Sequence, residues 1–403
     1  MPTDPVNPVP TGSGSARKPV VALVRIVATP YWLHLHRRLD QEIPEIELHC
    51  LYTLGVGDQP WVLTEQDVRP VVFAGKNEID PDRPVRTAIS DWKKAGRMIA
   101  WMREHHAAAV VVSGYNRVGG PRIARWCRSR RIPCFVTGDS NVHADTTTGY
   151  KRRVKSAIVR WMNRVCSGAL PFGTAGKKFY VKYGMDPARV FFFPAEPDYE
   201  LIGSLSREEV AAAASGSGLR PGRRRIVYCG RLIRVKRVDL LIEAYAAIAG
   251  ERPDWDLVIV GDGPLKASLQ AMVPDPIKAR VTWTGFIADQ RRIAGIYRSC
   301  DVLALPSDHE PWALVVNEAL AAGLAVVTSD VVGAADDLVR DGVNGKTFHR
   351  GDAEALARAL RDVTAPGTID SLKAGSRDVL AAWRTSGDPV AGFRAALRSA
   401  GVI

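Results

Sequence analysis

The chain has 403 residues, of which 46% are hydrophobic and 24% charged, and its formal net charge is +12. This composition is typical of a soluble globular protein with two or three domains, and no apolar run approaches the ~20 residues of a transmembrane helix. The excess of Lys and Arg favours anionic partners, which include nucleic acid, anionic lipid and phosphorylated substrates.

The cysteine and histidine patterns argue against a metal site. The six cysteines fall singly among apolar residues, and the eight histidines show no spacing typical of metal ligands. We therefore expect reduced cysteines, no metal and no other cofactor. The first 17 residues lack the apolar core of a signal peptide. We expect a cytoplasmic protein, and peripheral contact with the inner face of the membrane stays open.

The first half of the chain predicts one domain of parallel β/α units. Residues 1–17 are rich in proline, glycine and serine, which predicts a disordered tail. Apolar runs then alternate with helical patterns over residues 18–197, as in a Rossmann-like domain. The predicted strands are 20–28, 46–52, 71–73, 107–113 and 132–137, the predicted helices are 32–41, 86–106, 120–131 and 151–165, and residues 53–68 are turn-rich.

The predicted helix 151–165 allows two interpretations. Val154, Ile158, Trp161, Met162 and Val165 share one face, and lysines and arginines surround it. One interpretation is an ordinary helix that packs on its domain through this apolar face. The other is a basic surface bearing a tryptophan that meets anionic lipid headgroups.

A stretch of prolines and acids at 194–200 marks the boundary to a second doubly wound domain, residues 198–385. Its predicted strands are 226–229, 257–260, 281–284, 302–306, 324–329 and one within 342–348. Its predicted helices are 237–249, 264–272, 289–299, 312–322, 336–340 and 352–363. Residues 386–403 are expected to cross back over the first domain. The predicted fold class is α/β, with two Rossmann-like parallel-sheet domains that face a cleft.

Two groups of charged residues follow strands of the second domain. Strand 226–229 runs into Gly230, Arg231 and Lys236, which suit a diphosphate because arginine offers a bidentate fork and lysine a point charge. Glu310 follows strand 302–306, and Glu318 lies on the next helix. If both were helical, these two glutamates would stand roughly 12 Å apart along the axis, too far to share one proton. They suit two parts of one long ligand.

The second half resembles the retaining glycosyltransferases of the GT-B fold that carry a Glu–seven residues–Glu motif (group 1, family 4 type). The resemblance rests on the ordered segments GRLIRVK, VIVGDGP, VTWTGF, DVLALPSDHEPWALVVNEALAAGLAVVTSD and DGVNGKTF. The first half matches more loosely, through Thr29–Pro30–Tyr31 and the segments SGYN and GDSN. Pro311 and Trp312 stand where some members have glycine after the first glutamate, which leaves the shape of the sugar pocket open.

The resemblance implies roles for individual residues. Arg231 and Lys236 match the pair that holds the donor diphosphate, with Gly230 beside them, and Glu310 matches the acid that faces the donor sugar. The remaining donor-binding positions are Glu318 for the ribose, Gly285 and Phe286 for the base, and the amides near Ala313 and Leu314 for the phosphates. The first domain would contribute Pro30, Tyr31 and either Asp139 or His143.

This resemblance implies a metal-independent, retaining transferase that moves a sugar from a nucleotide-sugar to a hydroxyl of a glycan or lipid-linked acceptor. It also implies a role in surface polysaccharide or glycolipid synthesis. Two alternatives stay open. One is a nucleotide-sugar epimerase on the same fold. The other is a non-enzymatic basic protein that binds membranes or nucleic acid, although no nucleic-acid-binding signature accompanies the charge, so no nucleic acid is expected as a partner.

Overall fold

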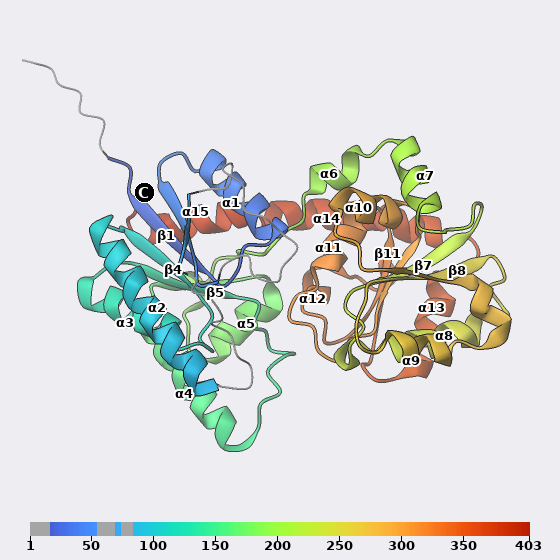
Figure 1. The fold of residues 1–403 in the computed structure, drawn as a ribbon, viewed down its shortest axis with the longest axis horizontal. Coiled ribbons are helices and arrows are strands. Elements are labelled where there is room, and N and C mark those ends of the chain that lie inside the picture. Colours follow the sequence, from blue (N-terminus) through green and yellow to red (C-terminus); the bar gives the residue numbers. More distant parts are fainter. Residues whose placement is uncertain (1–16, 55–68, 74–83) are drawn as a thin grey trace, which may run out of the picture.

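The computed structural model describes residues 17–54, 69–73 and 84–403. Within these ranges the chain forms two α/β domains, each built on a six-stranded parallel sheet flanked by helices (Figure 1). The predicted fold class is therefore confirmed. Most of the predicted tail 1–17 and of the turn-rich segment 53–68 lies outside the described residues.

The N-terminal sheet has the strand order β3-β2-β1-β4-β5-β6. Its strands are β1 Val20–Arg25, β2 Glu47–Tyr52, β3 Pro70–Val72, β4 Ala109–Ser113, β5 Cys134–Gly138 and β6 Gly168–Pro171. The helices of this half are α1 Pro30–Glu42, α2 Pro84–Glu104, α3 Gly119–Arg130, α4 Gly149–Val165 and α5 Thr174–Lys182, followed by the 3-10 turn η1 Pro187–Arg189. Every residue of β1 is buried, as expected for a central parallel strand that is covered on both faces.

The C-terminal sheet has the order β12-β11-β10-β7-β8-β9. Its strands are β7 Arg224–Cys229, β8 Trp255–Val260, β9 Val281–Gly285, β10 Val302–Leu305, β11 Ala325–Ser329 and β12 Gly345–Phe348. Its helices are α6 Tyr199–Ser204, α7 Arg207–Ser215, α8 Val238–Ile248, α9 Lys266–Met272, α10 Gln290–Arg298, α11 Leu314–Ala321, α12 Ala335–Leu338, α13 Ala353–Val363 and α14 Ile369–Ser386, with 3-10 turns η2 Arg234–Lys236 and η3 Asp275–Arg280.

Each sheet has one point where the strand order reverses. After β7 the chain builds outward through β8 and β9, and then returns to the other side of β7 to form β10. The N-terminal sheet reverses in the same way between β1 and β4. Connections leave the two strands in opposite directions at such a point, which opens a crevice at their carboxyl ends, where ligands of open α/β sheets bind.

The chain returns to the first domain at its end. Helix α14 runs alongside both domains in Figure 1, and Trp383 near its end packs against Trp312 and Phe192, with ring centroids 5.6 and 5.9 Å away. Helix α15, Pro389–Ser399, then lies on the N-terminal sheet, where the buried Phe393 stacks on Phe193 at 5.2 Å. The last helix thus completes the core of the first domain.

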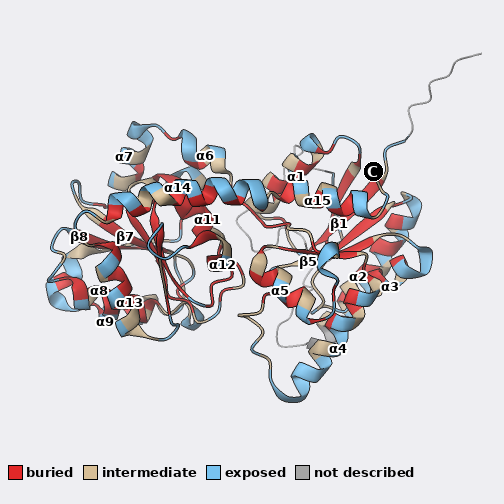
Figure 2. Ribbon diagram, turned by 180° about the vertical axis from the view of Figure 1, so that it is seen from behind, coloured by how far each residue is buried: buried red, intermediate tan, exposed pale blue. Residues whose placement is uncertain are grey.

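Helix α4 does not pack on its domain through the whole apolar face that its sequence predicts. Its buried residues are Val159, Met162 and Asn163, whereas Val154 and Ile158 of the predicted packing face are exposed. The expectation that Val154 and Ile158 pack on the domain is therefore wrong. Figure 2 shows most of α4 exposed at the edge of the N-terminal domain.

Two further expectations need smaller corrections. The strand predicted at 20–28 ends at Arg25. The helix predicted at 312–322 begins at Leu314, because Ala313 adopts a left-handed conformation with φ of 79°.

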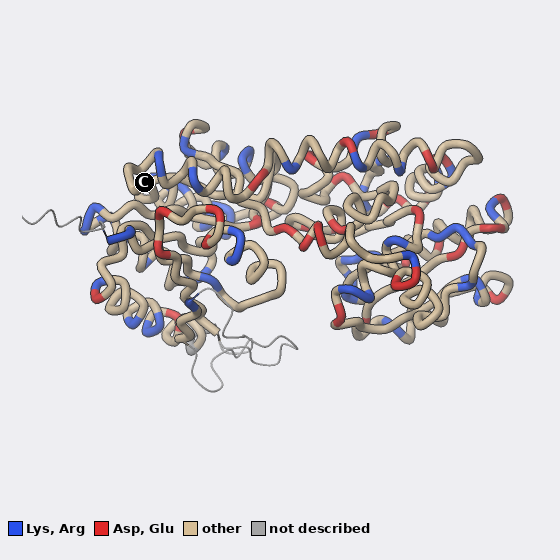
Figure 3. The backbone as a smooth tube through the Cα atoms, turned by 90° about the horizontal axis from the view of Figure 1, so that it is seen from above, with Lys and Arg blue, Asp and Glu red and all other residues tan. Residues whose placement is uncertain are grey.

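Lysines and arginines are intermixed with acids over both domains (Figure 3). None of the described helices is long and apolar enough to cross a membrane.

Candidate active site

The predicted donor residues gather at the reversal point of the C-terminal sheet. The loop after β7 carries Arg231 and Lys236, and the loop after the neighbouring strand β10 carries Glu310. Because β7 and β10 pair in parallel, with Val302 opposite Ile226, their carboxyl ends meet at one edge of the sheet. Residues far apart in the chain are thereby brought to one crevice.

Lys236 and Glu310 form an ion pair. The Lys236 ammonium donates to Glu310 Oε2, and Ser307 Oγ donates to the same oxygen at 3.3 Å. The two side chains are only 16% and 12% exposed. The backbone of Glu310 is fixed as well, because its carbonyl accepts from the Gly333 amide at 3.0 Å. A shielded lysine and carboxylate therefore stand side by side, each with a small surface still open to a ligand.

Arg231 lies in the same loop as Lys236 but is not part of this ion pair. Its side chain is exposed and makes no ion pair with any residue that the structure describes. The backbone is crowded here, because a Cβ on Gly261, whose φ is 135°, would stand 2.0 Å from the Gly230 carbonyl oxygen. Glycine at this strand end lets two adjacent loops approach closely. Because the Arg231 guanidinium is exposed and makes no ion pair with a described residue, it is available to bind an anion.

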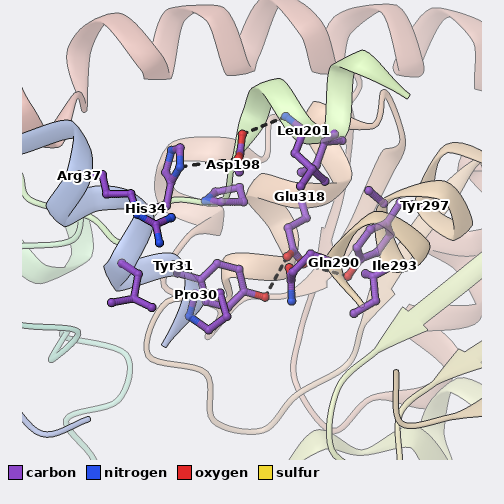
Figure 4. A pocket seen from close by; sticks show the side chains of 14 residues that line it. Pro30, Tyr31, His34, Arg37, Asp198, Leu201, Gln290, Ile293, Tyr297 and Glu318 are labelled. Atoms are coloured by element: carbon purple, nitrogen blue, oxygen red, sulfur yellow. Dashed lines mark hydrogen bonds and ion pairs between the residues drawn. The ribbon is translucent and has the colours of Figure 1, made fainter. Parts of the chain in front are cut away.

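Glu318 occupies a different environment, inside helix α11. It is buried, and it accepts hydrogen bonds from Tyr31 of the first domain at 3.0 Å and from Tyr297 of α10 at 3.1 Å (Figure 4). Burial raises its pKa to about 7, and the two tyrosine hydroxyls offset part of that shift. The two glutamates of the predicted motif thus face separate partners, Glu310 a lysine and Glu318 two hydroxyls.

A cavity of about 320 Å³ lies between the domains next to Glu318. Figure 4 shows Tyr31 entering it from α1 and Gln290 and Tyr297 from α10, with Glu318 between them. Pro30 forms the first turn of α1 and also lines this cavity. A ligand that reached Glu318 through the cavity would replace the Tyr31 hydroxyl as its hydrogen-bond donor.

The other candidates of the first domain lie apart from one another. Asp139, just after β5, is accessible to solvent, yet the surrounding protein raises its pKa by desolvation and the nearby Glu310 adds to the shift. His143 instead binds Asp336 of α12 at 2.8 Å, and this contact raises the pKa of His143. The structure therefore places Asp139, and not His143, near Glu310.

The positions suggested for the base and the phosphates differ in exposure: Phe286 is exposed, whereas Ala313 is buried. Phe286, directly after β9, is 61% exposed and so is not part of the core. Ala313 and Leu314 form the N-terminus of α11, where free backbone amides attract anions. Gly285 ends β9, which is separated from β10 by β7 and β8, and its carbonyl accepts from the Gly261 amide at 2.9 Å.

Sequence reasoning missed Tyr297 and Ser307. Tyr297 lies on an amphipathic helix, where a tyrosine is most simply explained as a core residue, and Ser307 is one of several polar residues in its loop.

Among the described residues, no group of three or more His, Cys, Asp or Glu side chains is placed to hold a metal ion. All six cysteines are unpaired, and five of them are buried.

Residues 223–365 match the model of the family described as glycosyl transferases group 1. This match covers β7 to α13 and includes Arg231, Lys236, Glu310 and Glu318. This part of the C-terminal domain is therefore similar to the glycosyltransferases of that family.

Curated relatives share part of the chain. A GDP-mannose-dependent α-(1-6)-phosphatidylinositol dimannoside mannosyltransferase of Mycobacterium tuberculosis is 28% identical over 286 residues, which are 70% of this chain and 65% of the relative. A D-inositol 3-phosphate glycosyltransferase of Mycolicibacterium gilvum is 36% identical over 191 residues, which are 45% and 40% of the two chains. The chain thus matches less than two thirds of the length of these glycosyltransferases.

Solved structures share the whole architecture. HepE of Anabaena, in complex with UDP and glucose, superposes with a TM-score of 0.72 at 16% identity, over 95% of this chain and 100% of the other. A sucrose-phosphate synthase of Thermosynechococcus elongatus gives a TM-score of 0.74 at 18% identity, again over 95% and 100%. The two domains together therefore have the GT-B fold.

Proposed function

We propose that the chain is a retaining glycosyltransferase that moves a sugar from a nucleotide-sugar to a hydroxyl of a glycan or lipid-linked acceptor. The observation that carries this proposal is the convergence of Arg231, Lys236 and Glu310 at the reversal point of the C-terminal sheet, opposite the first domain. The donor would bind there, and the acceptor would bind on the facing loops of the first domain. The relative named for mannosyl transfer to a phosphatidylinositol dimannoside supports a glycolipid product.

In this reaction the bond from the anomeric carbon to the diphosphate breaks, and a bond to the acceptor oxygen forms on the same face. Negative charge develops on the diphosphate as it leaves, and Arg231 and Lys236 stabilise this charge without a metal. The acceptor proton leaves with the diphosphate. Glu310 accepts hydrogen bonds from sugar hydroxyls, and Glu318 accepts them from the ribose in place of Tyr31.

The test is substitution of the two cations. Arg231→Ala and Lys236→Ala should each lower kcat by about 10²–10³, since preorganised donors to a developing charge contribute on that order. Arg234→Ala is the matched control, because Arg234 is exposed on the same loop. Steady-state rates with a nucleotide-sugar and acceptor give the answer. Near-normal turnover in both variants would contradict the proposal, and sugar conversion without an acceptor would identify an epimerase.

The donor can be found by thermal shift with UDP-, GDP- and ADP-sugars. A nucleotide-sugar at 100 times its dissociation constant should stabilise the protein by about 2.7 kcal/mol. Lys236→Ala leaves Glu310 without its partner, so its melting temperature must be measured before its kinetics are interpreted. Arg231 is exposed and unpaired, so Arg231→Ala tests the diphosphate contact without this complication.

A further inference from the structure

A second large cavity lies in the first domain, outside the site described above. It measures about 1190 Å³ and runs between α2, α3 and α4. We call it the α4 groove and define it by Trp92, Tyr115, Val154, Ile158 and Trp161, which line it. These side chains are apolar or aromatic, and the exposed fractions of Trp92 and Val154 are 52% and 54%. Large exposed apolar patches on soluble proteins usually mark sites that bind a ligand, a partner or a membrane.

The groove begins where an acceptor is expected. Tyr115 follows β4, whose carboxyl end lies at the reversal point of the N-terminal sheet and on the same edge as Tyr31. Along α4 the groove is lined by Val154, Ile158 and Trp161. Figure 1 places α4 at the edge of the N-terminal domain. A ligand could therefore place a polar head near the domain interface and an apolar chain along α4.

The rim of the groove is cationic. Arg117 and Lys155 are paired with Asp91 and Asp145 at 3.0 and 2.8 Å. Arg125 and Lys151 also line the groove, and neither makes an ion pair within the part of the chain that the structure describes. An apolar floor beside two unneutralised cations is complementary to a hydrocarbon chain that carries a negative group.

We infer that the α4 groove binds the hydrocarbon chain of an anionic lipid, with the negative headgroup against Arg125 and Lys151. That this lipid is the acceptor rests on the proposed function, whereas lipid binding itself does not. The exposed face of α4 thereby receives an explanation. Val154 and Ile158 are left uncovered by the domain because they contact the lipid.

Alkyl phosphates below their micellar concentrations are suitable probes. Binding of octyl, decyl and dodecyl phosphate, measured by calorimetry without nucleotide-sugar, should tighten about fourfold per added methylene, as apolar burial requires. The double variant Val154→Gln and Ile158→Gln should weaken dodecyl phosphate at least tenfold. Met272→Gln, at an equally exposed position on α9 of the other domain, is the matched control.

The cationic rim is tested by Arg125→Gln with Lys151→Gln, which should remove the preference for dodecyl phosphate over zwitterionic dodecylphosphocholine. Affinity independent of chain length, or equal effects of the groove variant and Met272→Gln, would overturn the inference. So would a dimer in sedimentation velocity that the groove variant dissociates, because a second copy would then be the occupant. A protein that binds these probes but no nucleotide-sugar would leave this inference standing and contradict the proposed function.

Discussion

Glu318 is the residue whose environment differs most from its sequence context. Nothing in NEALAAG indicates a buried acid, yet two tyrosines from different domains donate hydrogen bonds to it. Sequence patterns show that a helix has a polar residue, but they do not show which side chains of other elements surround that residue. The same limit applies to Lys236 and Glu310, whose shared location was predicted and whose direct contact was not.

Glu318 should make stability depend on pH. Burial raises the pKa of its carboxyl group to about 7 in the native state, whereas the ordinary pKa of a glutamate in water is 4.5. The native state therefore binds more protons than the unfolded state between these values, and the free energy of unfolding falls as pH rises across this window. Glu318→Gln should remove up to about 3 kcal/mol of this dependence.

Urea unfolding of both proteins at pH 5 and pH 8 measures the effect. Glu243→Gln, at an exposed position on α8, is the control and should retain the pH dependence of the parent protein. A Glu318→Gln variant with an unchanged dependence would show that the carboxylate is already ionised at pH 5.

At the scale of elements, sequence periodicity was sufficient for most strands and helices. Apart from β3 and β9 at the sheet edges, the strands are mostly buried apolar runs between turn residues. The alternation of such runs with helices predicts parallel sheets. The pattern was insufficient for α4, because two overlapping stripes satisfy a helical period and only the packing shows that Val159 and Met162 face the core. It also did not predict α14, whose apolar residues, among them Leu372 and Trp383, are spread thinly over 18 residues.

Helix α15 should be essential to the first domain. Phe393 is fully buried against Phe193, so Phe393→Ala should lower the free energy of unfolding by about 3–5 kcal/mol, as large-to-small substitutions of buried aromatics do. Arg398→Ala on the exposed face of α15 is the control. Hydrogen exchange should locate the loss in β1 and β2. Loss confined to the C-terminal domain would contradict the packing described here.

At the scale of the whole molecule, charged and polar contacts join the two domains. His143 and Lys178 of the first domain bind Asp336, Thr174 donates to Asp337, and Asn141 donates to the Pro311 carbonyl at 2.5 Å. Such pairings could not be derived from the sequence, because they depend on how two separately patterned domains meet. They are also contacts that a change of pH or salt can weaken.

The contact of His143 with Asp336 should make domain closure sensitive to pH. The pKa of His143 is raised in the native protein. The ion pair is therefore fully formed below pH 6.5, the ordinary pKa of histidine, and is lost as pH rises through the raised native pKa. Because the pair is partly exposed, its contribution is about 0.2–1 kcal/mol. Small-angle scattering should show a larger radius of gyration at pH 9 than at pH 6.

His143→Gln should remove most of this change. His349→Gln is the matched control, because His349 pairs with Asp330 inside the C-terminal domain. An identical response of the parent protein and His143→Gln would show that other groups govern the separation of the domains.

The position of α15 also has a consequence for biosynthesis. The hydrophobic surface formed by Leu35, Leu39 and Phe193 is covered by a helix that the ribosome makes only after the entire second domain. Domains of a nascent chain usually fold in order from the N-terminus. Here the first domain emerges with an unfilled gap in its core, and α15 closes this gap only after the second domain has been made.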